Sequence, residues 1–239
     1  MNDARFRPVT PRDRLILAVD TPDVAAARAA IEATRGSVGV YKIGLELIYA
    51  GGVELARELV GAGEKVFLDA KLLDIDNTMA GAVRSAVALG VDLLTLHAYP
   101  RAMAAAVAAR GPAKTALLAV TVLTSLDDGD LTEAGYRGTV AERVAERAAQ
   151  ARAAGIDGLV CSPQEVAAVR AVTGPGMLLV TPGVRPAGAD AGDQKRIATP
   201  GEAIRAGADM LVVGRPIMNA PDRRAAAEAI VAEIAAALG

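Results

Sequence analysis

The chain has 239 residues, of which 52% are hydrophobic and 23% charged, so it can bury a sizeable core and lacks the composition of a disordered protein. Its 26 basic and 28 acidic residues give a net charge of −2, so no overall positive field would attract nucleic acid or an anionic membrane. Because Cys161 is the only cysteine and no apolar run approaches the roughly 20 residues of a membrane helix, we expect a cytoplasmic protein without disulfides.

Short apolar runs alternate along the chain with longer, alanine-rich stretches. The runs predict eight strands, at residues 15–20, 38–43, 66–71, 93–97, 116–123, 158–161, 178–181 and 211–213. The stretches predict helices between them, for instance at residues 24–34, 139–154 and 223–238. Most of the runs are apolar almost throughout, as expected for parallel strands that are covered on both faces.

Eight strand–helix units in a chain of this length indicate an α/β protein with one closed (β/α)8 barrel, or TIM barrel. A doubly wound open sheet with fewer strands is the alternative. We expect the catalytic barrel to occupy residues 14–239, after an N-terminal extension at residues 1–13. The longest irregular stretch, residues 183–199, follows the seventh strand and is a candidate lid; a surface excursion without function is the other interpretation.

Polar side chains gather where the predicted strands end, which is the end of such a barrel that carries active sites. Asp20 closes the first strand, and Lys42 lies near the end of the second. Asp69 and Lys71 end the third strand and project to the same side because they are two residues apart, and Asp74 follows in the loop. Asp69, Lys71, Asp74 and Lys42 can form an alternating array of acids and lysines in which each charge has a partner. A salt-bridge network that merely closes the barrel is the structural alternative.

Two glycine–arginine turns predict an anion site. Gly214 and Arg215 directly follow the eighth strand, and Pro182, Gly183 and Arg185 follow the seventh. Loops after these two strands often bind phosphate through backbone amides. Together the turns favour a phosphorylated substrate, unless Arg185 simply pairs with an acid on the surface.

The remaining reactive side chains offer little to a metal or covalent mechanism. His97 is the only histidine, which excludes a multi-histidine metal site, and at a strand end it is expected to pack or to bond a carbonyl. Cys161 lies in the sixth strand and is expected in the core. Asp69 and Asp74 could hold Mg²⁺ through oxygen, but Lys71 between them argues against it. We therefore expect neither a metal nor a cofactor.

In their order along the chain, these motifs resemble the orotidine 5′-phosphate decarboxylases over essentially the whole barrel. The central signature is Asp69-Ala70-Lys71-Leu72-Leu73-Asp74-Ile75-Asp76-Asn77-Thr78. Its supports are Leu17-Ala18-Val19-Asp20, Tyr41-Lys42-Ile43-Gly44, Val122-Leu123-Thr124-Ser125, Thr181-Pro182-Gly183-Val184-Arg185, Gln194 and Val213-Gly214-Arg215-Pro216-Ile217. The acid–lysine–acid core alone is shared with sugar-phosphate decarboxylases and aldolases of the same superfamily, whereas the ordered set is specific.

The resemblance implies decarboxylation of orotidine 5′-monophosphate to uridine 5′-monophosphate, the last step of de novo pyrimidine synthesis. Lys71 would protonate C6 of the pyrimidine, with Asp69 and Asp74 fixing its ammonium and facing the substrate carboxylate. Asp20 and Lys42 would hold ribose hydroxyls, and Lys42 would also belong to the catalytic set with Lys71, Asp69 and Asp74. The other implied substrate-binding residues are Thr124 and Ser125 at the pyrimidine edge, and Pro182, Arg185, Gln194, Gly214 and Arg215 around the phosphate.

The resemblance also implies a homodimer with shared active sites, because residues that match Asp74 and Thr78 reach into the partner's site in this family. Two positions depart from the family pattern. Asp76 stands where members often carry proline, and Leu73 stands where many bacterial members carry histidine. Neither position matches a catalytic role, so the implied activity is unaffected.

Two other functions fit part of the pattern. A Mg²⁺-dependent decarboxylase or aldolase acting on a sugar phosphate would use the same barrel and the same acid–lysine–acid motif, although Thr124, Ser125 and Gln194 favour a pyrimidine. A catalytically silent barrel that binds nucleotides for regulation would bind the ligand without turnover.

Overall fold

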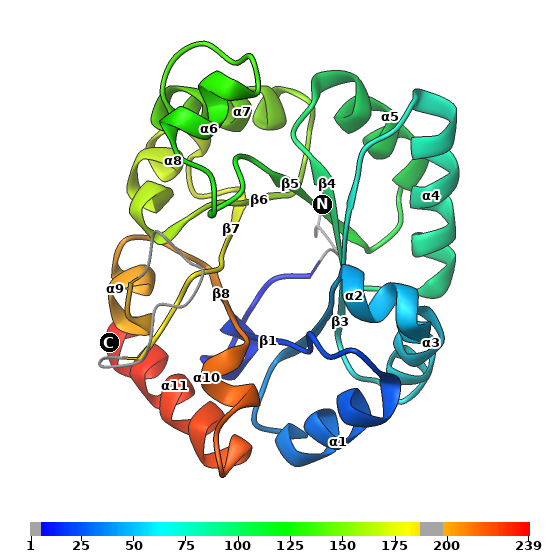
Figure 1. Cartoon of the computed structure of the whole chain (residues 1–239), viewed down its shortest axis with the longest axis vertical. Helices are drawn as coiled ribbons and strands as arrows, with labels where there is room; N and C mark the ends of the chain where they lie inside the picture. Colours follow the sequence, from blue (N-terminus) through cyan, green and yellow to red (C-terminus); the bar gives the residue numbers. More distant parts are fainter. Residues whose placement is uncertain (1–5, 187–197) are drawn as a thin grey trace.

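The computed structural model describes residues 6–186 and 198–239, and Figure 1 shows strands at the centre with helices around them. The strands are β1 (Leu15–Ala18), β2 (Val40–Ile43), β3 (Val66–Leu72), β4 (Leu93–His97), β5 (Ala116–Val120), β6 (Gly158–Val160), β7 (Leu178–Thr181) and β8 (Met210–Val213). All are parallel, neighbours in sequence are neighbours in space, and β8 closes the barrel on β1. The predicted (β/α)8 fold is confirmed, and the open sheet is excluded.

The helices cover the outside of the barrel. The longer ones are α1 (Val24–Thr34), α3 (Val53–Gly61), α4 (Asp76–Leu89), α5 (Pro100–Arg110), α7 (Val140–Ala153), α8 (Val166–Thr173) and α11 (Arg223–Leu238). Short helical segments are η1 (Arg12–Arg14), α2 (Leu45–Leu47), η2 (Ile48–Gly52), α6 (Asp128–Glu133), η3 (Pro163–Glu165), α9 (Pro200–Arg205) and α10 (Arg215–Met218). None of the described helices has both the length and the apolar character needed to cross a bilayer.

Several strands are shorter than their apolar runs predict. The run at residues 15–20 leaves the sheet after Ala18, the run at 116–123 after Val120, and the run at 158–161 after Val160. Residues beyond these ends, such as Val122 and Cys161, are still buried. An apolar run indicates which residues are buried, not which residues pair in a sheet. Because burial continues past the last hydrogen bond between strands, the predicted ends of these three strands are wrong by one to three residues.

The barrel interior is apolar toward the amino ends of the strands and polar at their carboxyl ends. Val40 and Phe67 belong to the cluster inside the barrel, and a larger cluster lies between the strands and the helices. Because side chains alternate along a strand, Lys42 and Asp69, each two residues further on, also face the interior. Alternation thus delivers charged groups to the carboxyl end of the barrel.

Three aspartates join neighbouring strands at the opposite, amino end. Asp92, Asp157 and Asp209 precede β4, β6 and β8, and each carboxylate accepts a backbone N–H from the preceding strand at 2.8 Å. Each ends a glycine–apolar–aspartate sequence. In the β1–β2 pair Gly39 takes the equivalent place, because a Cβ there would collide with the backbone of Arg12. In three of the four pairs an aspartate side chain therefore links the second strand to the first.

Asp13 anchors the segment before β1. Its carboxylate accepts the N–H of Thr10 at 2.9 Å and that of Val9 at 3.3 Å, and it lies 3.4 Å from Nζ of Lys65. Burial raises the pKa of Asp13, but the hydrogen bonds from Thr10 and the charge of Lys65 outweigh it and lower the pKa from 3.8 to about 2.

We predict that Asp13→Asn lowers the free energy of unfolding by roughly 2 kcal/mol at pH 7. A lowered folded-state pKa contributes stability that is present above the unfolded value, near 4, and is lost as the pH falls toward 2. Denaturant unfolding at several pH values should therefore show wild type and variant converging below pH 4, with the exposed Glu133→Gln as control. A difference that stays constant down to pH 2 would contradict the prediction.

Candidate active site

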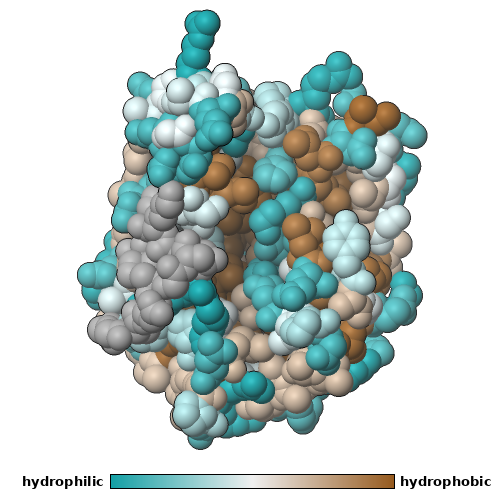
Figure 2. Space-filling model, in the orientation of Figure 1, coloured by the Kyte–Doolittle hydropathy of each residue, from teal (hydrophilic) through white to brown (hydrophobic). Residues whose placement is uncertain are grey.

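The carboxyl ends of the strands surround a cavity of about 560 Å³, visible in Figure 2 as a central hollow with an apolar floor. Its polar lining residues are Asp20, Lys42, Asp69, Lys71, Thr124, Arg185, Arg215 and Asn219. A cavity of this volume, mostly apolar with a few convergent charges, has the character of a small-molecule site.

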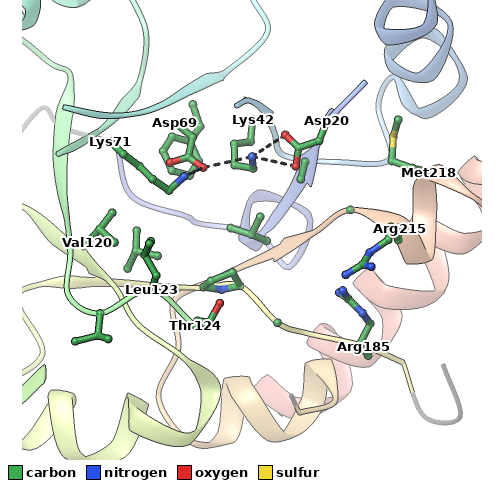
Figure 3. A pocket seen from close by; sticks show the side chains of 18 of the residues that line it. Asp20, Lys42, Asp69, Lys71, Val120, Leu123, Thr124, Arg185, Arg215 and Met218 are labelled. Carbon is green, nitrogen blue, oxygen red and sulfur yellow. Dashed lines mark hydrogen bonds and ion pairs between the residues drawn. The ribbon is translucent and has the colours of Figure 1, made fainter. Parts of the chain in front are cut away.

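Four charged residues form one continuous array along the wall of this cavity (Figure 3). Nζ of Lys42 lies 3.0 Å from Oδ1 of Asp20 and 3.3 Å from Oδ2 of Asp69. The same Oδ2 of Asp69 lies 2.8 Å from Nζ of Lys71. The predicted array of Lys42, Asp69, Lys71 and Asp74 is therefore present in part: Lys42, Asp69 and Lys71 are joined as expected, Asp20 takes the fourth place beside Lys42, and Asp74 has no place in it.

The array keeps its two buried members charged. Burial lowers the pKa of Lys42, but the negative charges of Asp69 and Asp20 outweigh it, so its pKa lies above the ordinary value. Burial raises the pKa of Asp69, but the positive charges of Lys42 and Lys71 outweigh it and hold its pKa below the ordinary value. At neutral pH the cavity thus contains the Asp69 carboxylate held against the Lys42 ammonium, with Nζ of Lys71 on its other side.

Lys71 reaches the cavity through an irregularity in β3. The register between β3 and β4 pairs Leu68 with Leu94 and then Leu72 with Leu96, so three residues of β3 lie opposite a single residue of β4. Within this bulge Lys71 has a φ of 47°, a left-handed conformation that costs a non-glycine residue roughly 1–3 kcal/mol. Asp69 and Lys71 do project together, but by a bulge rather than by the unbroken alternation expected from sequence.

Gly44 permits the close approach of Asp20 and Lys42. It follows β2, and a Cβ built on it would lie 2.5 Å from Oδ1 of Asp20 and 3.0 Å from Nζ of Lys42. A larger residue would therefore displace the ion pair. The sequence motif contains this glycine, but nothing in the sequence indicates that its role is to leave room for a salt bridge.

The two predicted arginines lie together at the end of the cavity away from Lys71. Figure 3 shows the guanidinium groups of Arg185 and Arg215 directed toward one another. Gly214 and Pro182 line the same region, and Gly214 immediately precedes α10. Two neighbouring guanidinium groups form a site suited to a dianion such as a phosphate monoester.

The segment that follows Arg185 is only partly described. Val184 and Ala198 form a β-bridge, and the N–H of Arg185 donates to the oxygen of Ala198 at 2.9 Å. The two ends of the predicted lid are therefore held together. Gln194 and the rest of residues 187–197 lie outside the described residues.

Three predicted site residues do not line the cavity of this chain. Asp74 is exposed just before α4, Thr78 is exposed in its first turn, and Ser125 is exposed beyond Thr124, which does line the cavity. The carboxylate of Asp74 accepts the N–H of Ile75 at 2.6 Å and forms no ion pair with Lys71 within the described chain. Within the described chain, neither Asp74 nor Thr78 therefore contributes to the cavity.

Sequence reasoning missed Thr95, in the middle of β4. Its hydroxyl is fully buried, donates to Oδ1 of Asp69 at 2.8 Å and accepts the N–H of Lys71 at 3.0 Å. The available signal was a lone polar residue on the inward face of an apolar strand. Met218 and Asn219, after β8, were also missed; they line the cavity from α10 and the residue that follows it.

The other reactive side chains lie outside the array. Cys161 is buried in the core, as predicted. His97 ends β4 and is half-buried; burial, and then the charges of Arg147 and Lys71, lower its pKa. In the part of the chain that the structure describes, no three His, Cys, Asp or Glu side chains come together as a candidate metal site.

Comparisons with known proteins identify the family of this chain. The model of the Orotidine 5′-phosphate decarboxylase / HUMPS family matches residues 13–230. The chain is 62% identical over 231 residues to the orotidine 5′-phosphate decarboxylase of Rhodopseudomonas palustris (strain ATCC BAA-98 / CGA009), covering 97% of this chain and 98% of that protein. It is 58% identical over 230 residues to the protein of the same name from Afipia carboxidovorans, covering 96% and 98%.

A solved structure supports the same grouping. The crystal structure of orotidine 5′-phosphate decarboxylase from Lactobacillus acidophilus matches with a TM-score of 0.82 at 35% identity, covering 96% of this chain and 99% of that chain. The matches extend over nearly the full length in both sequence and structure. The chain therefore belongs to the orotidine 5′-phosphate decarboxylase family.

Proposed function

We propose that this chain decarboxylates orotidine 5′-monophosphate to uridine 5′-monophosphate, the last step of de novo pyrimidine synthesis, without metal or cofactor. The observation that carries the proposal is that one cavity holds a lysine fixed by a buried carboxylate on one side and a pair of arginines on the other. These are the groups needed to act on one end of a nucleotide while gripping its phosphate.

The reaction requires stabilisation of negative charge at C6 of the pyrimidine. Loss of CO2 leaves an electron pair on that carbon, and no electron sink in the ring can accept it, so catalysis depends on groups that bind the carbanion better than the starting carboxylate. The Lys71 ammonium, held 2.8 Å from Asp69, supplies a positive charge that is already oriented and then donates its proton to C6. Asp69, ionised and close by, repels the substrate carboxylate but not the neutral CO2.

The rest of the cavity positions the nucleotide. We assign the ribose hydroxyls to Asp20 and Lys42, which lie between Lys71 and the arginine pair in Figure 3. The assigned contacts to the pyrimidine edge are Thr124 and Ser125, and those to the phosphate are Pro182, Arg185, Gln194, Gly214 and Arg215. The phosphate binds at a distance from C6. The free energy of that binding can offset the repulsion between the substrate carboxylate and Asp69.

We also propose that the protein is a homodimer. Leu45, Tyr49 and Val53 are spaced by four residues along the α2–α3 stretch and are 44%, 88% and 37% exposed. Leu73 and Ile75, on the loop between β3 and α4, are 49% and 73% exposed. Figure 2 shows hydrophobic surface gathered on the side of the hollow where these elements lie. Exposed apolar side chains in such numbers are typical of an association surface.

The position of Asp74 favours the same arrangement. It lies between Leu73 and Ile75, so a second copy that covers these side chains would also bury Asp74, at a cost unless it meets a cation. In a two-fold symmetric dimer Asp74 and Thr78 would enter the partner's cavity, where Lys71 offers that cation. Each site would then contain two acids around Lys71, one from each chain.

Mixing two inactive variants tests this shared site. In a dimer that pairs Lys71→Ala with Asp74→Ala, one cavity carries both changes and the other carries neither, so mixed dimers should recover about half of the native sites. Subunit exchange at equal concentrations should therefore restore turnover to roughly a quarter of the wild-type value. Absence of any recovery, with mixed dimers demonstrated by native mass spectrometry, would contradict the shared site.

The single cysteine suits a reducing compartment, and we propose that the protein is cytoplasmic.

We propose residues 1–13 as an extension to a catalytic barrel of residues 14–239; the family match, which begins at residue 13, supports this division.

The function is tested by following the ultraviolet absorbance of orotidine 5′-monophosphate in the presence of a metal chelator. We expect the absorbance change of decarboxylation, with one CO2 released per UMP formed. Turnover that appears only with added Mg²⁺, or only on a keto-sugar phosphate, would instead support the metal-dependent rival. Binding of the nucleotide without turnover would support a silent, regulatory barrel.

A further inference from the structure

The hydroxyl of Thr95 occupies the one point where the catalytic strand departs from regular pairing. In the bulge, Asp69, Ala70 and Lys71 all lie opposite Thr95, which is the only residue of β4 between the paired Leu94 and Leu96. A bulge leaves main-chain groups without their ladder partners. Here the N–H of Lys71 is satisfied by the side chain of Thr95 at 3.0 Å, so a threonine hydroxyl replaces the missing ladder acceptor.

The hydroxyl of Thr95 donates one hydrogen bond and accepts the other, and only one assignment of donor and acceptor is possible. A hydroxyl has one proton to donate. An ionised carboxylate can only accept and a backbone amide can only donate, so Thr95 must give its proton to Asp69 and receive that of Lys71. The hydroxyl is fully buried, so water does not compete for either position. It therefore links the side chain of Asp69 rigidly to the main chain of Lys71.

This link determines which oxygen of Asp69 is left for the lysines. Oδ1 accepts from Thr95 at 2.8 Å, while Oδ2 lies 2.8 Å from Nζ of Lys71 and 3.3 Å from Nζ of Lys42. Rotation of the carboxylate would break the Thr95 bond. At the other end, the bond to the Lys71 N–H favours the left-handed main-chain conformation, at φ 47°, from which that side chain enters the cavity.

We propose that Thr95 is a positioning residue for the proton donor: it sets the direction of the Lys71 ammonium by holding both the main chain of Lys71 and the carboxylate that the ammonium contacts. The inference rests on the proposed function. Thr95 itself does not line the cavity and does not touch the substrate. Its effect is on how often Lys71 is aimed at C6, and hence on kcat rather than on nucleotide binding.

The test compares Thr95→Val, which keeps the shape and removes both hydrogen bonds, with Thr95→Ser, which keeps the hydroxyl. A misplacement of about 1 Å can lower a rate by about 100-fold, so we expect Thr95→Val to lower kcat by about 10- to 100-fold while KM and the Kd for UMP change less than about threefold. Thr95→Ser should remain within about fivefold of wild-type kcat. Thr115→Val is the matched control, because Thr115 is also buried and its hydroxyl donates to Val91 at the amino end of the barrel.

The outcomes separate this inference from the proposed function. If wild type decarboxylates the nucleotide and Thr95→Val does so with the same kcat, the positioning role fails and the function stands. If Thr95→Val and Thr95→Ser lose kcat and UMP affinity alike, Thr95 is merely structural and the inference fails. If the wild type does not turn over orotidine 5′-monophosphate, both fail. Should Thr95→Val not fold, the kcat of Thr95→Ala relative to Thr95→Ser, with UMP binding as the measure of an intact cavity, decides the question.

Discussion

Replacement of Lys71 with alanine should lower kcat for orotidine 5′-monophosphate by about 10⁴-fold or more. The change removes both the positive charge beside the developing carbanion and the proton that ends the reaction, and general-acid and electrostatic contributions of this kind are each worth about 10²-fold or more. Asp69 keeps Lys42 as a partner at 3.3 Å, so the cavity should retain its shape. The affinity for UMP should therefore change only a few fold.

Stopped assays with high enzyme concentration measure the residual turnover, and calorimetric titration with UMP measures binding. Lys114→Ala, which removes an exposed lysine, serves as the control for a general effect of lost charge. Near-normal turnover of Lys71→Ala would remove Lys71 from the mechanism. Loss of UMP binding together with turnover would mean that the array holds the cavity together and would leave the chemical role unproven.

Arg215→Ala should reduce kcat/KM by a factor on the order of 10² to 10³, because truncation of one partner of a charged hydrogen-bonded contact costs about 2–5 kcal/mol. Arg185, which lies beside it in Figure 3, should keep some affinity for the phosphate. Guanidinium ion added at millimolar concentration should restore part of the lost activity, since it can occupy the space left by the side chain.

Two controls test whether the lost activity comes from the contact between Arg215 and the phosphate. Guanidinium should not activate the wild type or the Arg152→Ala variant, in which an exposed arginine on α7 is removed. Decarboxylation of the nucleoside, which has no phosphate, should be equally slow in wild type and Arg215→Ala. A variant that loses as much activity toward the nucleoside as toward the nucleotide would show that Arg215 acts on something other than phosphate.

Much of the fold and the array could be predicted because both follow from short-range rules. Periodicity locates eight strands, and alternation within them directs Lys42 and Asp69 into the barrel, while Asp20 follows just after the first strand. Those rules require only the sequence of one strand at a time. The prediction of Arg215 also needed only its position directly after the eighth strand.

The remaining features depend on more than one strand or more than one chain. The bulge at Lys71 and the bonds of Thr95 arise from pairing between β3 and β4, and periodicity within either strand does not report it. The role of Gly44 depends on where two side chains from different strands meet. The spacing of Asp74 predicts a local partner for Lys71, but the loop carries Asp74 to the surface, and a single chain's sequence does not report what a second copy would contact there.

The aspartate contacts at the amino end of the barrel join neighbouring strands two at a time. Asp92, Asp157 and Asp209 each fasten a strand to the one before it, so the strands are joined as β3–β4, β5–β6 and β7–β8, with Gly39 in the corresponding place of the first pair. A junction placed between these pairs leaves all three aspartate contacts intact. A junction within β3–β4, β5–β6 or β7–β8 would separate a carboxylate from its amide, so chimeras of this barrel should keep these three pairs whole.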